Sequence, residues 1–196
     1  MLPKEEIERI SSLPGEAIGA SLKEDVGFLL LKEGEEGLKR VEAELTKVSH
    51  PLQLKKIKTF HWYPFYYGIF IHAINRDLFQ WSDETYRENG RYSAKISVVL
   101  KIGIKYFISV ERTLEHVNRA WRMYYTMGEV SSEYDKEKRS IIVTFKGFTG
   151  HPTFCRSLEG FAWQVFYYHL RINTIVVKER ECPFNGGSAH RIQRTW

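Results

Sequence analysis

Residues 176–192 read VVKERECPFNGGSAHRI, an apolar start followed by charged residues, a turn-rich segment and a histidine. Alternation along an extended chain places Val177 and Glu179 on the same face, so a carboxylate shares a face with apolar side chains. The Pro/Gly segment that follows can turn the chain back and bring His190 beside Cys182 on an adjoining strand. We therefore expect two strands here, at residues 173–180 and 189–195.

A cysteine from elsewhere in the chain is expected to join this end of the sheet. The pattern predicts a helix over residues 152–170, with Cys155 near its start, and that helix must cross the same sheet. The set Cys155, Glu179, Cys182 and His190 would then offer two thiolates, one imidazole and one carboxylate. These ligand types suit a tetrahedral structural zinc ion, which would staple the helix to the last hairpin.

A second interpretation of the same residues needs no metal. The two cysteines can be separate buried thiols, and His190 can be a surface residue of a hairpin. Glu179 can pair with Arg180 or Arg191, because a buried carboxylate needs a cation nearby. The residues alone leave both interpretations open.

The remaining pattern predicts helices first and strands later. The expected helices lie at residues 4–11, 16–32, 38–48, 65–79, 83–107 with a break at 89–90, and 114–127. Two further strands are expected at residues 129–134 and 140–148. This order predicts an α+β fold, in which an N-terminal helical region packs on a mostly antiparallel four-stranded sheet with a long helix between the strand pairs. We expect residues 1–50 to form a helical extension, a candidate dimerisation element, and residues 51–196 to form the ligand-binding domain.

Composition favours a folded protein without a nucleic-acid partner. The net charge is +5, and the densest basic run, residues 55–58, lacks the aromatic interleaving of a nucleic-acid groove. No signal peptide opens the chain, and no apolar stretch is long enough to span a bilayer, so we expect a cytoplasmic protein without a membrane partner. Two cysteines do not make a disulfide framework.

The C-terminal third resembles a known family. The segments that carry the resemblance are His151-Pro152 through Phe154-Cys155-Arg156-Ser157-Leu158-Glu159-Gly160-Phe161, then Val177–Cys182, then Gly186-Gly187 to His190. They resemble the 4-vinyl reductase-type small-molecule-binding domain, which is related to haem–NO-binding and TRAPP-type folds. The resemblance implies a sensory domain that works as a dimer, with zinc ligands at Cys155, Glu179, Cys182 and His190. This sequence has His190 where many relatives have a further Cys.

The aromatic residues favour binding of a small molecule over catalysis. Aromatic residues make up 14% of the chain, and Phe107, Trp121, Tyr124 and Phe148 are our candidates for a pocket wall around a small apolar or aromatic ligand. The predicted function is a sensory or scaffold domain with a homodimer or signalling partner. The alternative is a ligand-free protein–protein adaptor whose core is filled. No nucleotide-binding glycine motif and no nucleophile elbow gives a positive signal for an enzyme.

Haem binding is a third alternative, because the related folds include haem proteins. Haem needs an axial ligand in an apolar pocket, and His72 and His116 both lie in helical patterns. The Tyr-x-Ser-x-Arg signature that holds haem carboxylates in the NO-sensing relatives is absent, since Tyr92-Ser93-Ala94-Lys95 does not match it.

Overall fold

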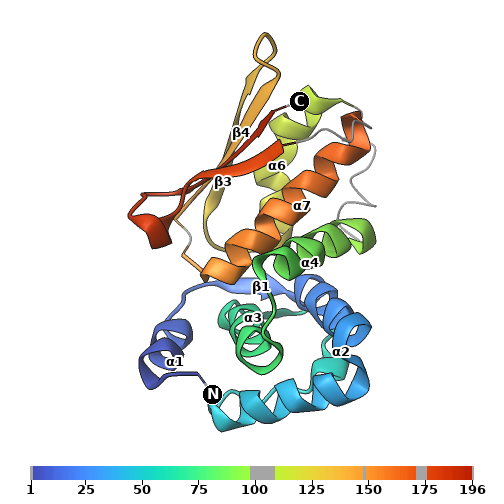
Figure 1. Cartoon of the computed structure of the whole chain (residues 1–196), viewed down its shortest axis with the longest axis vertical. Coiled ribbons are helices and arrows are strands. Elements are labelled where there is room, and N and C mark those ends of the chain that lie inside the picture. Colours follow the sequence, from blue (N-terminus) through green and yellow to red (C-terminus); the bar gives the residue numbers. More distant parts are fainter. Residues whose placement is uncertain (1, 98–108, 148, 171–175, 196) are drawn as a thin grey trace.

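The computed structural model describes residues 2–97, 109–147, 149–170 and 176–195, and the chain has two halves. One half holds the helices α1, α2 and α3, and the other holds a four-stranded sheet with helices α6 and α7 against it (Figure 1). Helix α4 lies between the halves, alongside α7. The predicted α+β class, with a helical N-terminal region and a mostly antiparallel sheet, is confirmed.

The helical half agrees with the sequence prediction at Gly34 and differs from it at residue 16. Its helices are α1 (Lys4–Ser11), α2 (Gly19–Lys47) and α3 (Tyr66–Phe79), with a short 3-10 turn at Leu54–Lys56. The two helices predicted at 16–32 and 38–48 are the two arms of α2, which meet at a kink at Gly34. Gly34 has φ of 66° and ψ of −168°, non-helical angles that glycine adopts without steric cost, so the predicted interruption of the helix at this residue is confirmed. The predicted helix start at residue 16 is wrong, because Glu16–Ile18 is a short strand, β1, paired with β2 (Trp62–Pro64).

Helix α4 (Asp83–Ile96) runs through the glycine that the sequence suggested as a break. Gly90 lies where α4 and α7 (Pro152–Leu170) cross, and a Cβ atom there would be 1.8 Å from the carbonyl oxygen of Ser157. Gly160 of α7 is the corresponding glycine on the other helix, because a Cβ atom there would be 2.0 Å from the carbonyl oxygen of Arg87. The two glycines therefore allow the helix backbones to touch. The predicted continuation of this helix to residue 107 lies beyond residue 97, outside the described residues.

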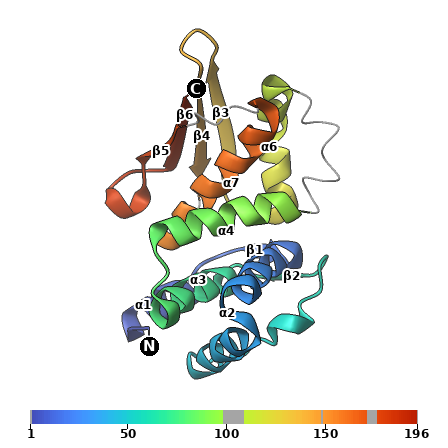
Figure 2. The same cartoon turned by 45° about the vertical axis from the view of Figure 1, so that its right-hand side comes forward.

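The sheet has the strand order β3-β4-β6-β5, and every pairing is antiparallel. Its strands are β3 (Glu129–Asp135), β4 (Ser140–Lys146), β5 (Val176–Glu181) and β6 (His190–Thr195), with a 3-10 turn at Pro183–Asn185. Helices α6 (Val110–Tyr124) and α7 cover one face of the sheet (Figure 2). Along β6 buried and half-buried residues alternate, which is the pattern of a sheet with one covered face.

One continuous apolar core joins the two halves. It extends from Ile10 of α1 to Ile192 of β6. A seam of backbone contacts also connects the halves, because Ala17 of β1 bridges Tyr125, the residue that follows α6. A domain boundary at residue 50 stays a prediction.

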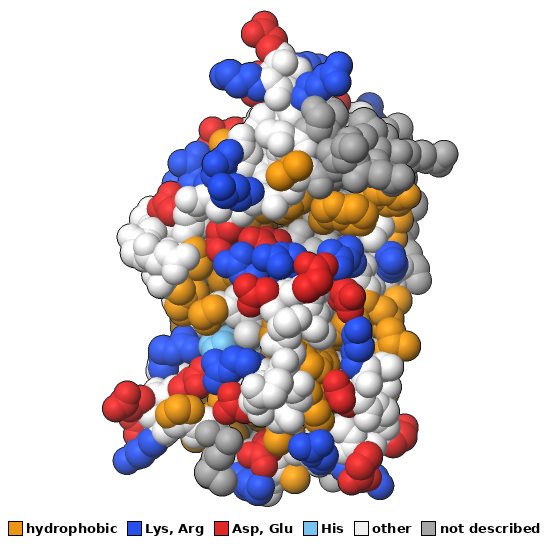
Figure 3. Space-filling model, in the orientation of Figure 1, with side chains coloured by type: hydrophobic (Ala, Val, Ile, Leu, Met, Phe, Trp, Pro, Cys, Tyr) orange, Lys and Arg blue, Asp and Glu red, His pale blue; other side chains and the backbone are white. Residues whose placement is uncertain are grey.

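The surface carries mixed charges. On the face shown in Figure 3, basic and acidic side chains are interspersed over most elements, so no patch of a single sign dominates that face. Within the described part of the chain, none of the helices has the length and apolar character needed to cross a bilayer.

Candidate functional site

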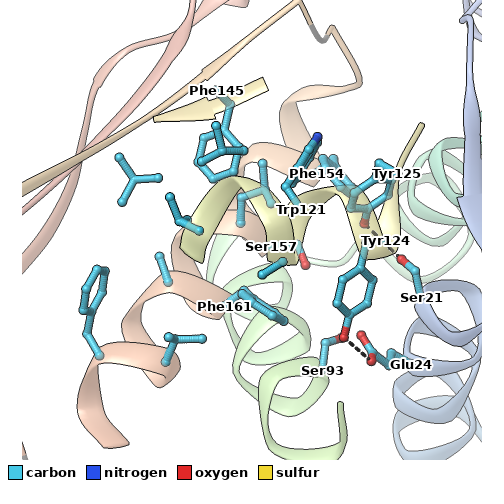
Figure 4. Close-up of a pocket in the computed structure, with 18 of the residues that line it drawn as sticks. Ser21, Glu24, Ser93, Trp121, Tyr124, Tyr125, Phe145, Phe154, Ser157 and Phe161 are labelled. Atoms are coloured by element: carbon cyan, nitrogen blue, oxygen red, sulfur yellow. Dashed lines mark hydrogen bonds between the residues drawn. The ribbon is translucent and has the colours of Figure 1, made fainter. Parts of the chain in front are cut away.

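A cavity of about 140 Å³ lies between α2, α4, α6, α7 and the sheet (Figure 4). Its apolar lining residues are Leu114, Val117, Ala120, Trp121, Val130, Val143, Phe145, Phe154, Leu158, Phe161, Ala162, Val165 and Phe166. Its other lining residues are Ser21, Glu24, Asp25, Ser93, Thr113, Tyr124, Tyr125 and Ser157. The wall is therefore apolar and rich in aromatic rings, with the carboxyl groups confined to α2.

Two of the four predicted wall residues lie at this cavity. Trp121 and Tyr124 line it from α6, whereas Phe107 and Phe148 lie outside the described residues. The prediction missed the contribution of α7, whose Phe154 and Phe161 point into the cavity (Figure 4). Leu158 lies between them in sequence, so the three-to-four spacing of apolar residues along 152–170 was a usable signal.

The polar end of the cavity is built around Glu24 of α2, which is only 6% exposed. The Tyr124 hydroxyl donates a hydrogen bond to Glu24 Oε1 at 3.0 Å and lies against the Ser97 hydroxyl (Figure 4 shows the first contact). Burial raises the pKa of Glu24 to about 9, and the neighbouring carboxylate of Asp25 adds to the rise, while the hydroxyls of Tyr124 and Ser97 oppose it. Glu24 is therefore a neutral carboxylic acid at neutral pH.

The adjacent carboxylate has a different set of partners. Asp25 Oδ1 accepts hydrogen bonds from His72 Nε2 and Asn89 Nδ2, each at 3.2 Å. The sequence held an unused signal for this site. Asp25 falls between Leu22 and Leu29 on the apolar stripe of α2, and an acidic residue on such a stripe is unusual.

The four residues predicted to hold a metal lie together near the N-terminal end of α7. Each offers one ligand atom, and these atoms all lie within 4.8 Å of one another. Cys155 Sγ is 3.4 Å from His190 Nδ1, which is 3.7 Å from Glu179 Oε1. Cys155, Cys182 and His190 are buried, and both cysteines are free thiols. The structure therefore brings together the four residues that the sequence analysis grouped, and their binding of a metal stays a prediction.

A cation also reaches this cluster, as the second interpretation required, but it comes from a different residue. Arg156 Nη2 donates to Glu179 Oε2 at 2.6 Å, whereas the arginines considered from sequence were Arg180 and Arg191. Burial acts to raise the pKa of Glu179, but the hydrogen bond from His190 and the charge of Arg156 outweigh it and lower that pKa. Burial raises the pKa of both the Cys155 and Cys182 thiols.

Comparisons with known proteins give a structural match without a sequence match. No protein-family model and no curated protein match the sequence. An H-NOX protein from S. oneidensis in the Fe(II)NO state is similar in structure, with a TM-score of 0.67, 11% identity, and coverage of 90% of this chain and 97% of that chain. An oxygen-binding H-NOX domain related to soluble guanylate cyclases has a TM-score of 0.58 at 14% identity, over 88% of this chain and 90% of that one. An H-NOX structure used to probe haem distortion has a TM-score of 0.61 at 15% identity, over 91% and 94%.

These similarities correct two expectations from the sequence. The relation to haem–NO-binding folds is supported at the level of the fold, whereas the 4-vinyl reductase-type and TRAPP-type resemblances find no support. Zinc as the cofactor was wrong, because the similar structures are haem proteins. The reason for the error is that the cysteine and histidine pattern indicates ligand chemistry at one corner of the sheet and carries no information about the cavity. The described chain has the fold of H-NOX domains.

Proposed function

We propose that this chain is a sensory domain that binds a small molecule in the cavity between its two halves. The observation that supports the proposal is the form of the cavity, with aromatic walls and a group of polar side chains around Glu24. Concave, mostly apolar sites with a few convergent polar groups are the usual form of small-molecule sites. The solved structures that share the fold are described as binding NO or oxygen, so they also bind small ligands.

Haem is the ligand that the fold suggests, but the described lining residues do not fit it. Among the described residues that line the cavity, none is His, Cys or Met, the commonest axial ligands. The two histidines considered from sequence have other partners. His72 is hydrogen-bonded to Asp25, and His116 Nδ1 donates to the Arg112 carbonyl of its own helix at 2.9 Å.

The remaining axial candidates and the volume also disagree with haem. Tyrosine can ligate haem iron, but burial raises the pKa of both Tyr124 and Tyr125 far above the usual range, which disfavours the phenolate. A cavity of about 140 Å³ is also smaller than the roughly 300 Å³ at which pockets for drug-sized ligands begin, and haem is larger than such ligands. The proposed ligand is therefore a smaller molecule than haem.

Native mass spectrometry tests the proposal. The mass of the purified native protein should exceed the denatured mass by one small organic molecule, and a titration with hemin should give no saturable Soret band. Ala162→Leu, which fills the cavity from α7, should abolish the extra mass. The matched control is Ala43→Leu, an exposed position on α2. An unliganded native protein whose binding of every probe is unchanged by Ala162→Leu would favour the adaptor with a filled core.

The output of such a domain needs a recipient, and we propose a second copy of the chain or a signalling partner. The amphipathic helices of residues 1–50 are the proposed contact region, as the sequence suggested. Sedimentation velocity of the full chain at several concentrations measures this directly. A single monomeric species at all concentrations would rule out the homodimer and leave the separate partner.

We propose, as a second function, that Cys155, Glu179, Cys182 and His190 bind a soft transition-metal ion that links α7 to β6. Three elements and one loop supply four ligand atoms within 4.8 Å of one another, and this observation favours a metal over chance proximity. Four protein ligands would leave no open position, so the ion would stabilise the fold and not act in catalysis.

Cobalt(II) titration is a direct test of the metal site. Binding should produce the intense near-ultraviolet charge-transfer bands of thiolate–cobalt bonds at about one ion per chain, and Cys182→Ser should remove them. The control variant is Glu181→Gln, whose carboxylate accepts hydrogen bonds from Ser188 outside the cluster. If wild-type protein shows no such bands, the ion pair with Arg156 is the sufficient account of Glu179 and the metal site is withdrawn.

A further inference from the structure

The cavity also constrains the chemical class of its ligand, an inference that rests on the proposed function. Its volume of about 140 Å³ is close to that of an engineered apolar cavity in another protein, about 150 Å³, which binds benzene. The space therefore matches one six-membered ring with one small substituent.

The aromatic side chains of the cavity walls favour a ligand that contains a ring. Trp121, Phe145, Phe154 and Phe161 come from α6, β4 and α7, so aromatic surfaces face the space from three elements (Figure 4). Trp121 and Phe145 already pack edge to face, with ring centroids 5.2 Å apart, and Phe154 packs in the same manner against Tyr125 at 6.2 Å. Aromatic rings prefer this offset geometry, and it leaves ring faces and edges available to a further ring.

The polar end selects for a hydrogen-bond acceptor. The hydroxyl of Tyr125 is engaged with Ser21 at 3.0 Å, and that of Tyr124 with Glu24 and Ser97. The neutral carboxyl group of Glu24 lines the cavity and supplies an O–H donor of its own. A ligand oxygen that accepts this proton would form one more hydrogen bond at this polar end, beside those with the hydroxyls of Tyr124 and Ser97.

The same end disfavours charged ligands. An anion would lie beside the carboxylate of Asp25, which also lines the cavity, and the two charges would repel each other. A cation would require ionisation of the buried Glu24, and a buried ion pair recovers its desolvation cost only with excellent geometry. The carboxylate of Asp25 already has donors in His72 and Asn89, and none of the described lining residues is a Lys or an Arg.

We infer that the cavity binds a neutral, single-ring molecule whose one polar substituent is an oxygen acceptor directed at Glu24. Ring and acceptor occupy opposite ends of the cavity, because Phe145 and Glu24 do (Figure 4). The carboxyl group of Glu24 positions the ligand, and the aromatic walls supply most of the apolar contact.

Three probes of equal ring size test this inference, namely cyclohexanone, methylcyclohexane and cyclohexylammonium. Their affinities can be compared by ligand-observed NMR on the full chain. Cyclohexanone should bind about 10-fold more tightly than methylcyclohexane, the effect of one net hydrogen bond. Cyclohexylammonium should not bind. Ala162→Leu should remove binding of all probes.

Variants at Glu24 separate its role from that of the walls. Glu24→Leu should equalise cyclohexanone and methylcyclohexane, whereas Glu24→Gln, which keeps a donor, should preserve the preference. Glu33→Gln is the matched control, because Glu33 is on the same helix outside the cavity and accepts a hydrogen bond from Trp81. Equal affinities of the two neutral probes in wild-type protein would overturn the role of Glu24.

Failure of the inference can be told apart from failure of the proposed function. Tightest binding by cyclohexylammonium, or saturable hemin binding that Ala162→Leu removes, would leave a ligand-binding cavity and overturn the neutral single-ring class. Absence of binding by every probe and by hemin, together with a more stable Ala162→Leu variant, would overturn the proposed function itself.

Discussion

Glu24 is buried and Glu179 is half-buried, and the structure shifts their pKa values in opposite directions. Glu24 has hydroxyl partners and a second acidic residue beside it, so burial dominates and the acid stays neutral. Glu179 has Arg156 Nη2 at 2.6 Å and His190 within 3.7 Å, so the charged form is favoured. The neighbours of the two carboxyls, together with the deeper burial of Glu24, account for the opposite shifts of their pKa values.

The largest expected effect comes from a change in α7, the helix that contributes residues to both the cavity and the Cys155 cluster. Helix α7 carries Arg156 of one site and Phe161 of the other, and Gly160 holds it against α4. Gly160→Val should lower the free energy of unfolding by about 3 kcal/mol or more, because the new side chain meets the backbone of α4. Urea unfolding measures this. Gly68→Ala is the control, since its Cβ would meet only Leu22 at an ordinary 3.4 Å. Similar losses in the two variants would contradict the close helix crossing.

Removal of one cation should affect the two carboxylates that it contacts, Glu179 and Glu159. Arg156→Met leaves the Glu179 carboxylate without its closest positive partner and Glu159 without one of its two arginines, and loss of one member of a largely buried pair costs about 3 kcal/mol. Arg156→Lys should recover part of the loss, because the charge remains without the second donor. Urea unfolding at neutral pH gives both values. A change below about 1 kcal/mol in the methionine variant would mean that the Glu179 carboxylate is held by other groups.

Glu24→Gln, unlike the Arg156 variants, should increase stability relative to wild type, and the increase should grow with pH. The ordinary pKa of Glu24 is 4.5 and the folded value is about 9. Between these values the folded state holds a proton that the unfolded state lacks, so stability falls as pH rises through this window. The glutamine variant lacks this loss, and its melting temperature should exceed the wild-type value increasingly from pH 5 to pH 8. The relative gain should reach at least about 2 kcal/mol. Parallel pH profiles for the two proteins would show that Glu24 is ionised in the fold.

Removal of the Tyr124 hydroxyl should have the smallest effect on stability. It should also widen the difference between the pKa values of Glu24 and Glu179. Tyr124→Phe deletes a donor to Glu24 and should cost about 1 kcal/mol, the typical net value of one hydrogen bond. Because that hydrogen bond lowers the pKa of Glu24, the variant should keep the acid neutral to a higher pH. Carboxyl-carbon NMR titration of both proteins measures the shift. A fall in the pKa of Glu24 would contradict the described partners.

The sheet and the corner cluster were the parts that sequence reasoning could reach. Period-two alternation located β4, and the spacing of Cys182 and His190 around a turn predicted that they meet. Both inferences use local geometry, which a sequence encodes directly. The assignment of Arg156 as the partner of Glu179 needed the crossing of α7 over β5 and could not come from neighbouring positions in the chain.

The cavity and the glycines were harder to read. A glycine inside a helix looks like an interruption until its partner is known, and for Gly90 the partner is a backbone more than sixty residues away in sequence. Gly34, in contrast, was correctly predicted as an interruption, because its non-helical backbone angles are a local property of glycine. The neutral state of Glu24 depends on three elements that bury it together. Such features depend on tertiary packing and are not written in any one segment.

The seam at Tyr125 has a mechanical consequence for helix α6. The backbone of Glu16 donates to Thr126 Oγ1 at 2.8 Å, and Thr126 N donates to the Glu16 carbonyl at 3.0 Å, so one end of α6 is fastened to the helical half. The helix has 15 residues, a lever of about 22 Å. A tilt of about 5° at this pivot would carry the first turn of α6 through roughly 2 Å. A ligand that displaces Trp121, near the attached end of α6, would therefore produce a larger displacement at the first turn of the helix, beside β3.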